Sequence, residues 1–153
     1  MKGANNMAVT IQWFPGHMAK AIRQFEENVS LVDIVFEVID ARIPLTSQNP
    51  EVARITGEKP HLFILTKKDL ADREATQRWL AYFKDHGQPA IAVDAKDHFN
   101  INDVLSVINP IMAPKLAREE QKGMKKRPIR AVSVGVPNVG KSTVLNRLVN
   151  RRA

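Results

Sequence analysis

With 153 residues, 44% of them hydrophobic and 25% charged, the chain has the length and composition of a folded domain rather than of a disordered protein. It carries a formal net charge of +7 and contains no cysteine, which excludes a disulfide framework, a zinc ribbon and a thiol nucleophile. No apolar run approaches the roughly 20 residues of a membrane span, and the first residues lack the apolar stretch of a signal peptide, so we expect a cytoplasmic protein without a membrane contact.

Predicted helices and apolar strands alternate through the first half of the chain. Apolar residues spaced by three or four predict an amphipathic helix over about 17–31. A run rich in β-branched residues predicts a buried strand over 33–39, and a second strand is predicted over 61–65. Between them, Asn49 followed by Pro50 is typical of the start of a helix.

The same alternation continues through the second half. Asp72 suits the N-cap of a helix that runs to about His86, where Gly87 would end it. Alternating strands and helices of this kind predict an α/β fold, a three-layer sandwich with a mostly parallel sheet. The remaining predicted elements are strands over 90–93 and 129–134, a helix from 101 that ends or kinks near Pro110, and a helix over 141–150.

The positive charge is concentrated in the last quarter of the chain. Segment 115–130 has seven basic and two acidic residues, and segment 131–153 has four basic and no acidic residues. We interpret 115–130 as a basic linker within the domain, but such a cluster also suits a polyanionic partner such as RNA. Because it contains no aromatic residue, it would contact phosphates rather than stacked bases.

A phosphate-binding loop is predicted at 135–142, where GVPNVGKS matches the pattern G-x-x-x-x-G-K-[ST] between a strand and a helix. Backbone N–H groups of the loop and the N-terminus of the following helix would hold phosphate oxygens. Lys141 would reach the β- and γ-phosphates, and the Ser142 hydroxyl would bind Mg²⁺. The predicted nucleotide-binding residues of this loop are Pro137, Asn138, Val139, Gly140, Lys141, Ser142 and Thr143.

A base-recognition motif follows the predicted strand 61–65, where Thr66, Lys67 and Asp69 fit the pattern [NT]-K-x-D. One carboxylate can accept hydrogen bonds from both N1–H and the 2-amino group of guanine. Adenine instead presents an acceptor at N1, so Asp69 would select guanine. The stem of Lys67 would lie along the face of the base. The alternative is that Asp69 only caps the turn after the strand.

The loop after the strand 90–93 is a weaker part of the same prediction. Asp94 and Ala95 could direct backbone N–H groups at guanine O6, although any loop at the end of a strand would look similar. The two motifs together predict GTP and GDP as ligands. Asp69 argues against an ATP-dependent P-loop enzyme such as a kinase, a third interpretation that a preference for ADP over GDP would favour.

The order of the motifs differs from that of Ras-like GTPases, because the base motif precedes the phosphate loop. WFPGHMAKA at 13–21, DARIP at 40–44, TKKD at 66–69 and GVPNVGKS at 135–142 together resemble the ribosome biogenesis GTPase A family of circularly permuted GTPases. The resemblance covers nearly the whole chain. It implies a circularly permuted Ras-like GTPase domain over 1–153, incomplete at its C-terminal end.

This resemblance also implies partners and residue roles. A member of this family binds the large ribosomal subunit late in assembly, contacts ribosomal RNA and hydrolyses GTP. His17 would help to position the attacking water, or else have only a structural role at a helix start. Asn138 would help to bind K⁺ beside the phosphates, or else make a plain loop hydrogen bond. Thr66 replaces the usual Asn, so we expect its hydroxyl to tether the phosphate loop less well, and Asp94 replaces a frequent Ser or Thr.

Several elements of the family follow the P-loop helix and are not in this sequence: the switch threonine, the D-x-P-G box and a helical RNA-binding domain. The two sheet strands that the family has between the P-loop helix and the D-x-P-G box are also missing, so we expect an open sheet edge beside the P-loop strand. Because the motif that orients water is absent, we expect weak GTP hydrolysis by this chain alone. The main interpretation is a GTP-hydrolysing assembly factor in which Lys141 and Mg²⁺ stabilise charge on the phosphates. The alternative is a non-enzymatic ribosomal RNA-binding module that uses 115–130, whose binding would weaken with salt and survive Lys141→Ala.

Overall fold

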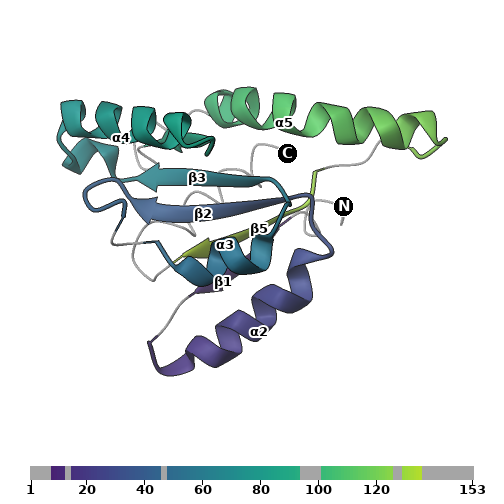
Figure 1. Cartoon of the computed structure of the whole chain (residues 1–153), viewed down its shortest axis with the longest axis horizontal. Coiled ribbons are helices and arrows are strands. Elements are labelled where there is room, and N and C mark those ends of the chain that lie inside the picture. Colours follow the sequence, from purple (N-terminus) through teal and green to yellow (C-terminus); the bar gives the residue numbers. More distant parts are fainter. Residues whose placement is uncertain (1–7, 13–14, 46–47, 94–100, 126–128, 136–153) are drawn as a thin grey trace.

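The computed structural model describes residues 8–12, 15–45, 48–93, 101–125 and 129–135. Within these ranges, five strands form one sheet in the order β1-β5-β2-β3-β4, and every neighbouring pair is parallel (Figure 1). This confirms the predicted α/β fold with a parallel sheet, and the predicted helix 141–150 lies outside the described residues. The strands are β1 (Ala8–Gln12), β2 (Ile34–Asp40), β3 (His61–Thr66), β4 (Ala90–Ala92) and β5 (Ala131–Gly135).

Helices cover both faces of the sheet. Side chains alternate along a strand, so Val35 of β2 points to one face and Phe36 to the other. The face of Val35 is covered by α2 (Met18–Val29) and α3 (Pro50–Thr56), and further along the sheet by α4 (Arg73–Asp85). The face of Phe36 is covered by α5 (Ile101–Gln121), which gives three layers. None of the described helices is both long enough and apolar enough to span a membrane.

Local capping explains where α3 and α4 begin. Asn49 Oδ1 accepts a hydrogen bond from the backbone N–H of Glu51 at 2.9 Å, with Pro50 as the first helical residue. Asp72 Oδ2 accepts from the N–H of Ala75 at 2.8 Å and caps α4 in the same way. After α4 the backbone turns at Gly87, where φ is +71°, a region that glycine enters without strain. These three predictions are confirmed.

Of the two outcomes predicted for the helix from residue 101, an end or a kink near Pro110, the end is wrong. Helix α5 continues through Pro110 and Pro114 to Gln121. Both prolines are exposed, so the carbonyl groups that lose a helical hydrogen bond there face water rather than the core. The opposite side of α5 is buried against the sheet through residues four apart, which holds the helix in place across both prolines: Val104, Ile108 and Met112.

The basic segment is also not a linker from residue 115, because 115–121 form the last turns of α5. Asp33, which is 1% exposed just before β2, binds both ends of the segment. Its Oδ1 accepts a hydrogen bond from Lys115 Nζ at 2.6 Å, and its Oδ2 accepts one from the N–H of Arg130 at 2.8 Å. A buried carboxylate needs such partners, so Asp33 fixes α5 and the start of β5 to the amino-terminal edge of the sheet.

The expected open edge beside β5 is not found. Strand β1, for which the sequence pattern predicted no element, pairs with β5 over five residues, from Ala8 with Ala131 to Gln12 with Gly135. Its Ile11 is 2% exposed and packs in the core beneath α2. Strand β5 therefore lies inside the described sheet, between β1 and β2, and β1 is the edge strand.

Candidate guanine-nucleotide site

The two predicted motifs begin at the same edge of the sheet. Strand β5 ends at Gly135, the first residue of the predicted phosphate loop, and β3 ends at Thr66, the first residue of the base motif. Because all strands are parallel, both ends lie at the carboxyl edge, where α/β proteins bind ligands. Strand β2 lies between them, so the two ends are about 10 Å apart at the usual strand spacing. That separation suits a nucleotide with its phosphates at β5 and its base at β3.

Most of the predicted contact residues lie outside the described part of the chain. Of the predicted phosphate loop the structure describes only its first residue, Gly135, and the predicted roles of its later residues stay predictions. The roles predicted for the loop that follows β4 and Val93 also stay predictions, because its residues are outside the described ranges. The predicted residues outside the described ranges are Asp94, Ala95, Pro137, Asn138, Val139, Gly140, Lys141, Ser142 and Thr143.

His17 lies in the segment that follows the carboxyl end of β1, at the same edge of the sheet as the start of the predicted phosphate loop. Strand β1 ends at Gln12 beside Gly135, and the chain then forms the short 3₁₀ helix η1 (Pro15–His17) before α2. His17 is exposed and occupies the N-cap position of α2, yet its side chain makes no capping hydrogen bond to that helix. Its imidazole is therefore not used to begin α2, which is compatible with a role toward a ligand at this edge.

Lys67 adopts an unusual backbone conformation at the end of β3. Its φ of 61° and ψ of 35° are left-handed, and it is the one non-glycine residue with positive φ among those described. The chain then enters the 3₁₀ helix η2 (Lys68–Leu70), in which the N–H of Leu70 donates to the Lys67 carbonyl at 2.9 Å. Asp69 belongs to η2 by its backbone, and its side chain lies outside what the structure describes.

Thr66 ties the end of β3 to the end of β2. Its hydroxyl donates to the Ile39 carbonyl at 3.2 Å, and its own carbonyl accepts from the N–H of Ala41 at 2.9 Å. A hydroxyl has one proton to donate. With that proton directed at Ile39, Thr66 can tether the phosphate loop only by accepting hydrogen bonds, for example from backbone N–H groups.

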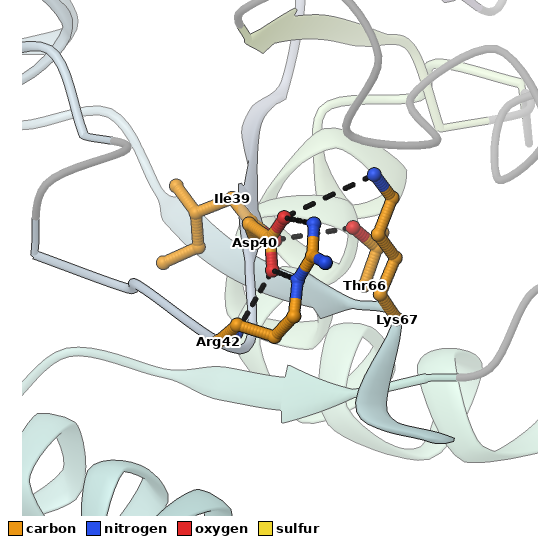
Figure 2. Close-up of polar contacts among 5 residues, drawn as sticks. All are labelled: Ile39, Asp40, Arg42, Thr66 and Lys67. Carbon is orange, nitrogen blue, oxygen red and sulfur yellow. Dashed lines mark hydrogen bonds and ion pairs between the residues drawn. The ribbon is translucent and has the colours of Figure 1, made fainter. Parts of the chain in front are cut away.

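A buried carboxylate lies beside the base motif. The sequence analysis used this residue, Asp40, only as part of the family signature DARIP. Asp40, at the end of β2, is 4% exposed. Its Oδ1 accepts from the backbone N–H of Arg42 at 2.9 Å and from Arg42 Nε at 3.0 Å, and its Oδ2 accepts from Nη2 at 2.7 Å. Figure 2 shows that Lys67 also extends toward Asp40, with Nζ 3.9 Å from Oδ2. The signal in the sequence was an acid and an arginine two residues apart directly after a buried strand.

The Arg42 guanidinium holds the pKa of Asp40 below the value of 3.8 for a free aspartate, although burial acts in the opposite direction. A lowered pKa in the folded state stabilises the fold above the unfolded pKa, and the contribution disappears as the pH falls through the folded pKa. We therefore expect Arg42→Ala to lower the free energy of unfolding by about 1–2 kcal/mol at pH 7. The difference from wild type should shrink below pH 4, as measured by urea unfolding at several pH values.

The matched control is Arg54→Ala. Arg54 also pairs with a nearby carboxylate, that of Glu51, but this pair lies on the surface. Its removal should change stability little at any pH. A stability loss in Arg42→Ala that is the same at pH 7 and pH 3 would contradict the assigned charge state of Asp40.

Comparisons with known proteins agree with this geometry. The family model described as "50S ribosome-binding GTPase" matches residues 130–153. The ribosome biogenesis GTPase A of Priestia megaterium is 48% identical over 145 residues, which cover 94% of this chain and 50% of that protein. That of Bacillus pumilus is 46% identical over 143 residues, again 94% of this chain. Over nearly its whole length, the chain is similar to proteins named ribosome biogenesis GTPase A. It spans about half the length of these relatives.

Solved structures of YlqF share the fold of this chain. The GDP-bound structure of YlqF from T. maritima is 30% identical, with a TM-score of 0.65, and covers 86% of this chain and 49% of that one. The GNP-bound form of YlqF is 31% identical, with a TM-score of 0.66 and coverage of 88% and 49%. The predicted fold of a circularly permuted P-loop GTPase, covered in part by this chain, is therefore confirmed.

Proposed function

We propose that this chain is the guanine-nucleotide-binding part of a GTPase that acts in late assembly of the large ribosomal subunit. The observation that carries the proposal is the position of Gly135 and Thr66 at one edge of the sheet with β2 between them. Relatives named ribosome biogenesis GTPase A, and a mitochondrial ribosome-associated GTPase 1 of Xenopus tropicalis at 41% identity, support the ribosomal role.

Hydrolysis would depend on positioning and electrostatics. The phosphate-loop N–H groups and Lys141 would stabilise negative charge on the β- and γ-phosphates as water attacks in line. His17, which starts from the same sheet edge, would orient that water. Mg²⁺, held by the Ser142 hydroxyl, would neutralise phosphate charge, because an oxygen donor suits this hard cation. The amide oxygen of Asn138 would similarly suit K⁺.

The basic segment 115–130 would provide a contact with ribosomal RNA in the cytoplasm. Its described cations divide into two groups, because Lys115 and Arg130 form ion pairs with Asp33 whereas the others are exposed on the surface. Exposed cations can neutralise RNA phosphates, which makes such binding sensitive to salt. Within the described residues of the segment, the exposed cations other than Arg130 are Arg118, Lys122 and Lys125.

Calorimetric titration of the chain with GDP and with ADP, in the presence of Mg²⁺, tests the proposal. We expect saturable GDP binding and no measurable ADP binding, because the carboxylate of Asp69 would be left unpaired against adenine. Lys141→Ala should remove the GDP signal while leaving the circular dichroism spectrum unchanged. Equal binding of ADP and GDP, or GDP binding that persists in Lys141→Ala, would contradict the proposed site.

A further inference from the structure

We propose that Asp40 is a positioning residue for guanine recognition: its carboxylate holds the ammonium group of Lys67, so that the stem of Lys67 lies over the base. The inference rests on the proposed function, because it concerns the same nucleotide site. It adds to the site a residue from β2, the strand that lies between the two motifs.

The register of the sheet brings the two residues together. Asp40 is paired with Thr66 across β2 and β3, and Lys67 is the first residue after the end of β3. Lys67 Nζ lies 3.9 Å from Asp40 Oδ2, and the Lys67 side chain is 30% exposed. The ammonium group thus has an anchor inside the protein, while part of the side chain stays accessible to a ligand (Figure 2).

The backbone of Lys67 is a second, independent observation. A left-handed conformation is unfavourable for a residue with a Cβ, and it persists only where the surrounding structure holds it. One attachment is the hydrogen bond from Leu70 to the Lys67 carbonyl. The other is the side chain, which extends toward the carboxylate at the end of β2 (Figure 2). Contacts at both the backbone and the side chain are expected where the direction of a side chain, here that of Lys67, matters for binding a ligand.

Arg42 makes Asp40 a fixed anchor. Its guanidinium and backbone N–H donate three hydrogen bonds to the carboxylate, all of 3.0 Å or less. The longer distance to Lys67 is that of an ion pair without a short hydrogen bond. These three hydrogen bonds fix the position of the Asp40 carboxylate, to which the Lys67 ammonium is attached by the longer ion pair.

The contact between the Lys67 stem and the base predicts that Asp40 affects the affinity for a nucleotide but not the preference between purine bases. A lysine stem packs on the flat face of any purine. The 2-amino group that distinguishes guanine from hypoxanthine is at the edge of the ring, where Asp69 would bind. Loss of the anchor should therefore weaken the binding of GDP and of inosine diphosphate (IDP, whose base is hypoxanthine) by the same factor. The preference for GDP over IDP should stay unchanged.

The test is calorimetry with GDP and IDP on Asp40→Asn, Lys67→Met and the double variant. We expect Asp40→Asn to weaken both nucleotides by about three- to five-fold. In the Lys67→Met background, where the ammonium is gone, Asp40→Asn should have less than about a 1.5-fold effect. Such non-additivity would not arise if Asp40 only stabilised the fold.

Two further variants control for stability. Asp33→Asn changes another buried, paired carboxylate at the opposite edge of the sheet, so it should lower the melting temperature without changing GDP affinity. If Asp40→Asn does not fold because Arg42 is left unpaired, Asp40→Asn combined with Arg42→Gln removes both charges and should show the same loss of affinity.

Unchanged GDP affinity in Asp40→Asn, or an equal loss with and without the Lys67 ammonium, would overturn this inference while leaving the proposed function intact. A wild-type chain that binds neither GDP nor IDP would overturn the proposed function, and the inference with it. The two failures are therefore distinguishable from the wild-type titration alone.

Discussion

Asp69→Asn is expected to lose most of its affinity for GDP and to gain affinity for xanthosine diphosphate. The variant replaces an acceptor-only carboxylate with an amide that has one acceptor and one donor. Guanine presents two donors, so one of the two charged hydrogen bonds is lost and the other is weakened, which should cost about 100-fold or more in affinity. Xanthine has a carbonyl in place of the 2-amino group and matches the amide. Competition of both diphosphates against a fluorescent GDP analogue measures the change.

The control for this prediction is Asp72→Asn, three residues further along. Asp72 caps α4, and Asn caps a helix as well as Asp does. Its affinity for GDP should equal that of the wild type. If Asp69 merely caps the turn after β3, Asp69→Asn would behave like Asp72→Asn and show no gain for the xanthine nucleotide.

Phe25→Ala is expected to destabilise the domain by about 3–5 kcal/mol. Phe25 of α2 has no exposed surface, and it lies in the cluster that packs this helix on β5. Truncation would leave a cavity in the cluster that contains Val132 and Val134, two residues of β5, the strand that leads into the predicted phosphate loop. The free energy of unfolding in urea is the measurement, with Leu31→Ala as the control.

Leu31 is 60% exposed and follows the same helix, so its truncation should change the free energy of unfolding by less than about 0.5 kcal/mol. Comparable losses for the two variants would mean that α2 does not pack on β5 as described. A loss in Phe25→Ala alone would show that this helix supports the strand from which the phosphate loop begins.

The elements that were predicted well are those whose cause is local. The cap at Asn49 depends on residues next to it, and the stop at Gly87 depends on its own backbone freedom. Strands buried on both faces, such as β2, appear as continuous apolar runs because helices cover both sides. In each case a short stretch of sequence contains the physical reason for the structure.

The predictions are wrong where contacts between residues far apart in the sequence determine the secondary structure. Pro110 predicts a helix end by itself, but the packing of Met112 on the sheet keeps the helix intact beyond it. Strand β1 is too short to be stable alone, and it forms because β5 offers it a partner far along the chain. Neither fact is contained in the neighbouring sequence.

The same limit applies to the candidate site. Thr66, Lys67 and Asp69 lie within four consecutive residues of the chain, so a sequence pattern could identify the motif. The contact between Asp40 and Lys67 joins the ends of two strands that become neighbours only in the folded sheet. The ion pair therefore needed the register of β2 and β3 before its part in the site could be inferred.

The position of β5 inside the sheet has a consequence for synthesis on the ribosome. Strand β1 emerges first, and its partner β5 emerges about 120 residues later. At about 5–20 residues per second, this takes roughly 6–24 seconds. During that interval only β2, β3 and β4 can pair among the described strands, and contacts between residues so far apart form slowly. Nascent chains would therefore be unable to bind nucleotide until β5 has joined the two parts of the sheet.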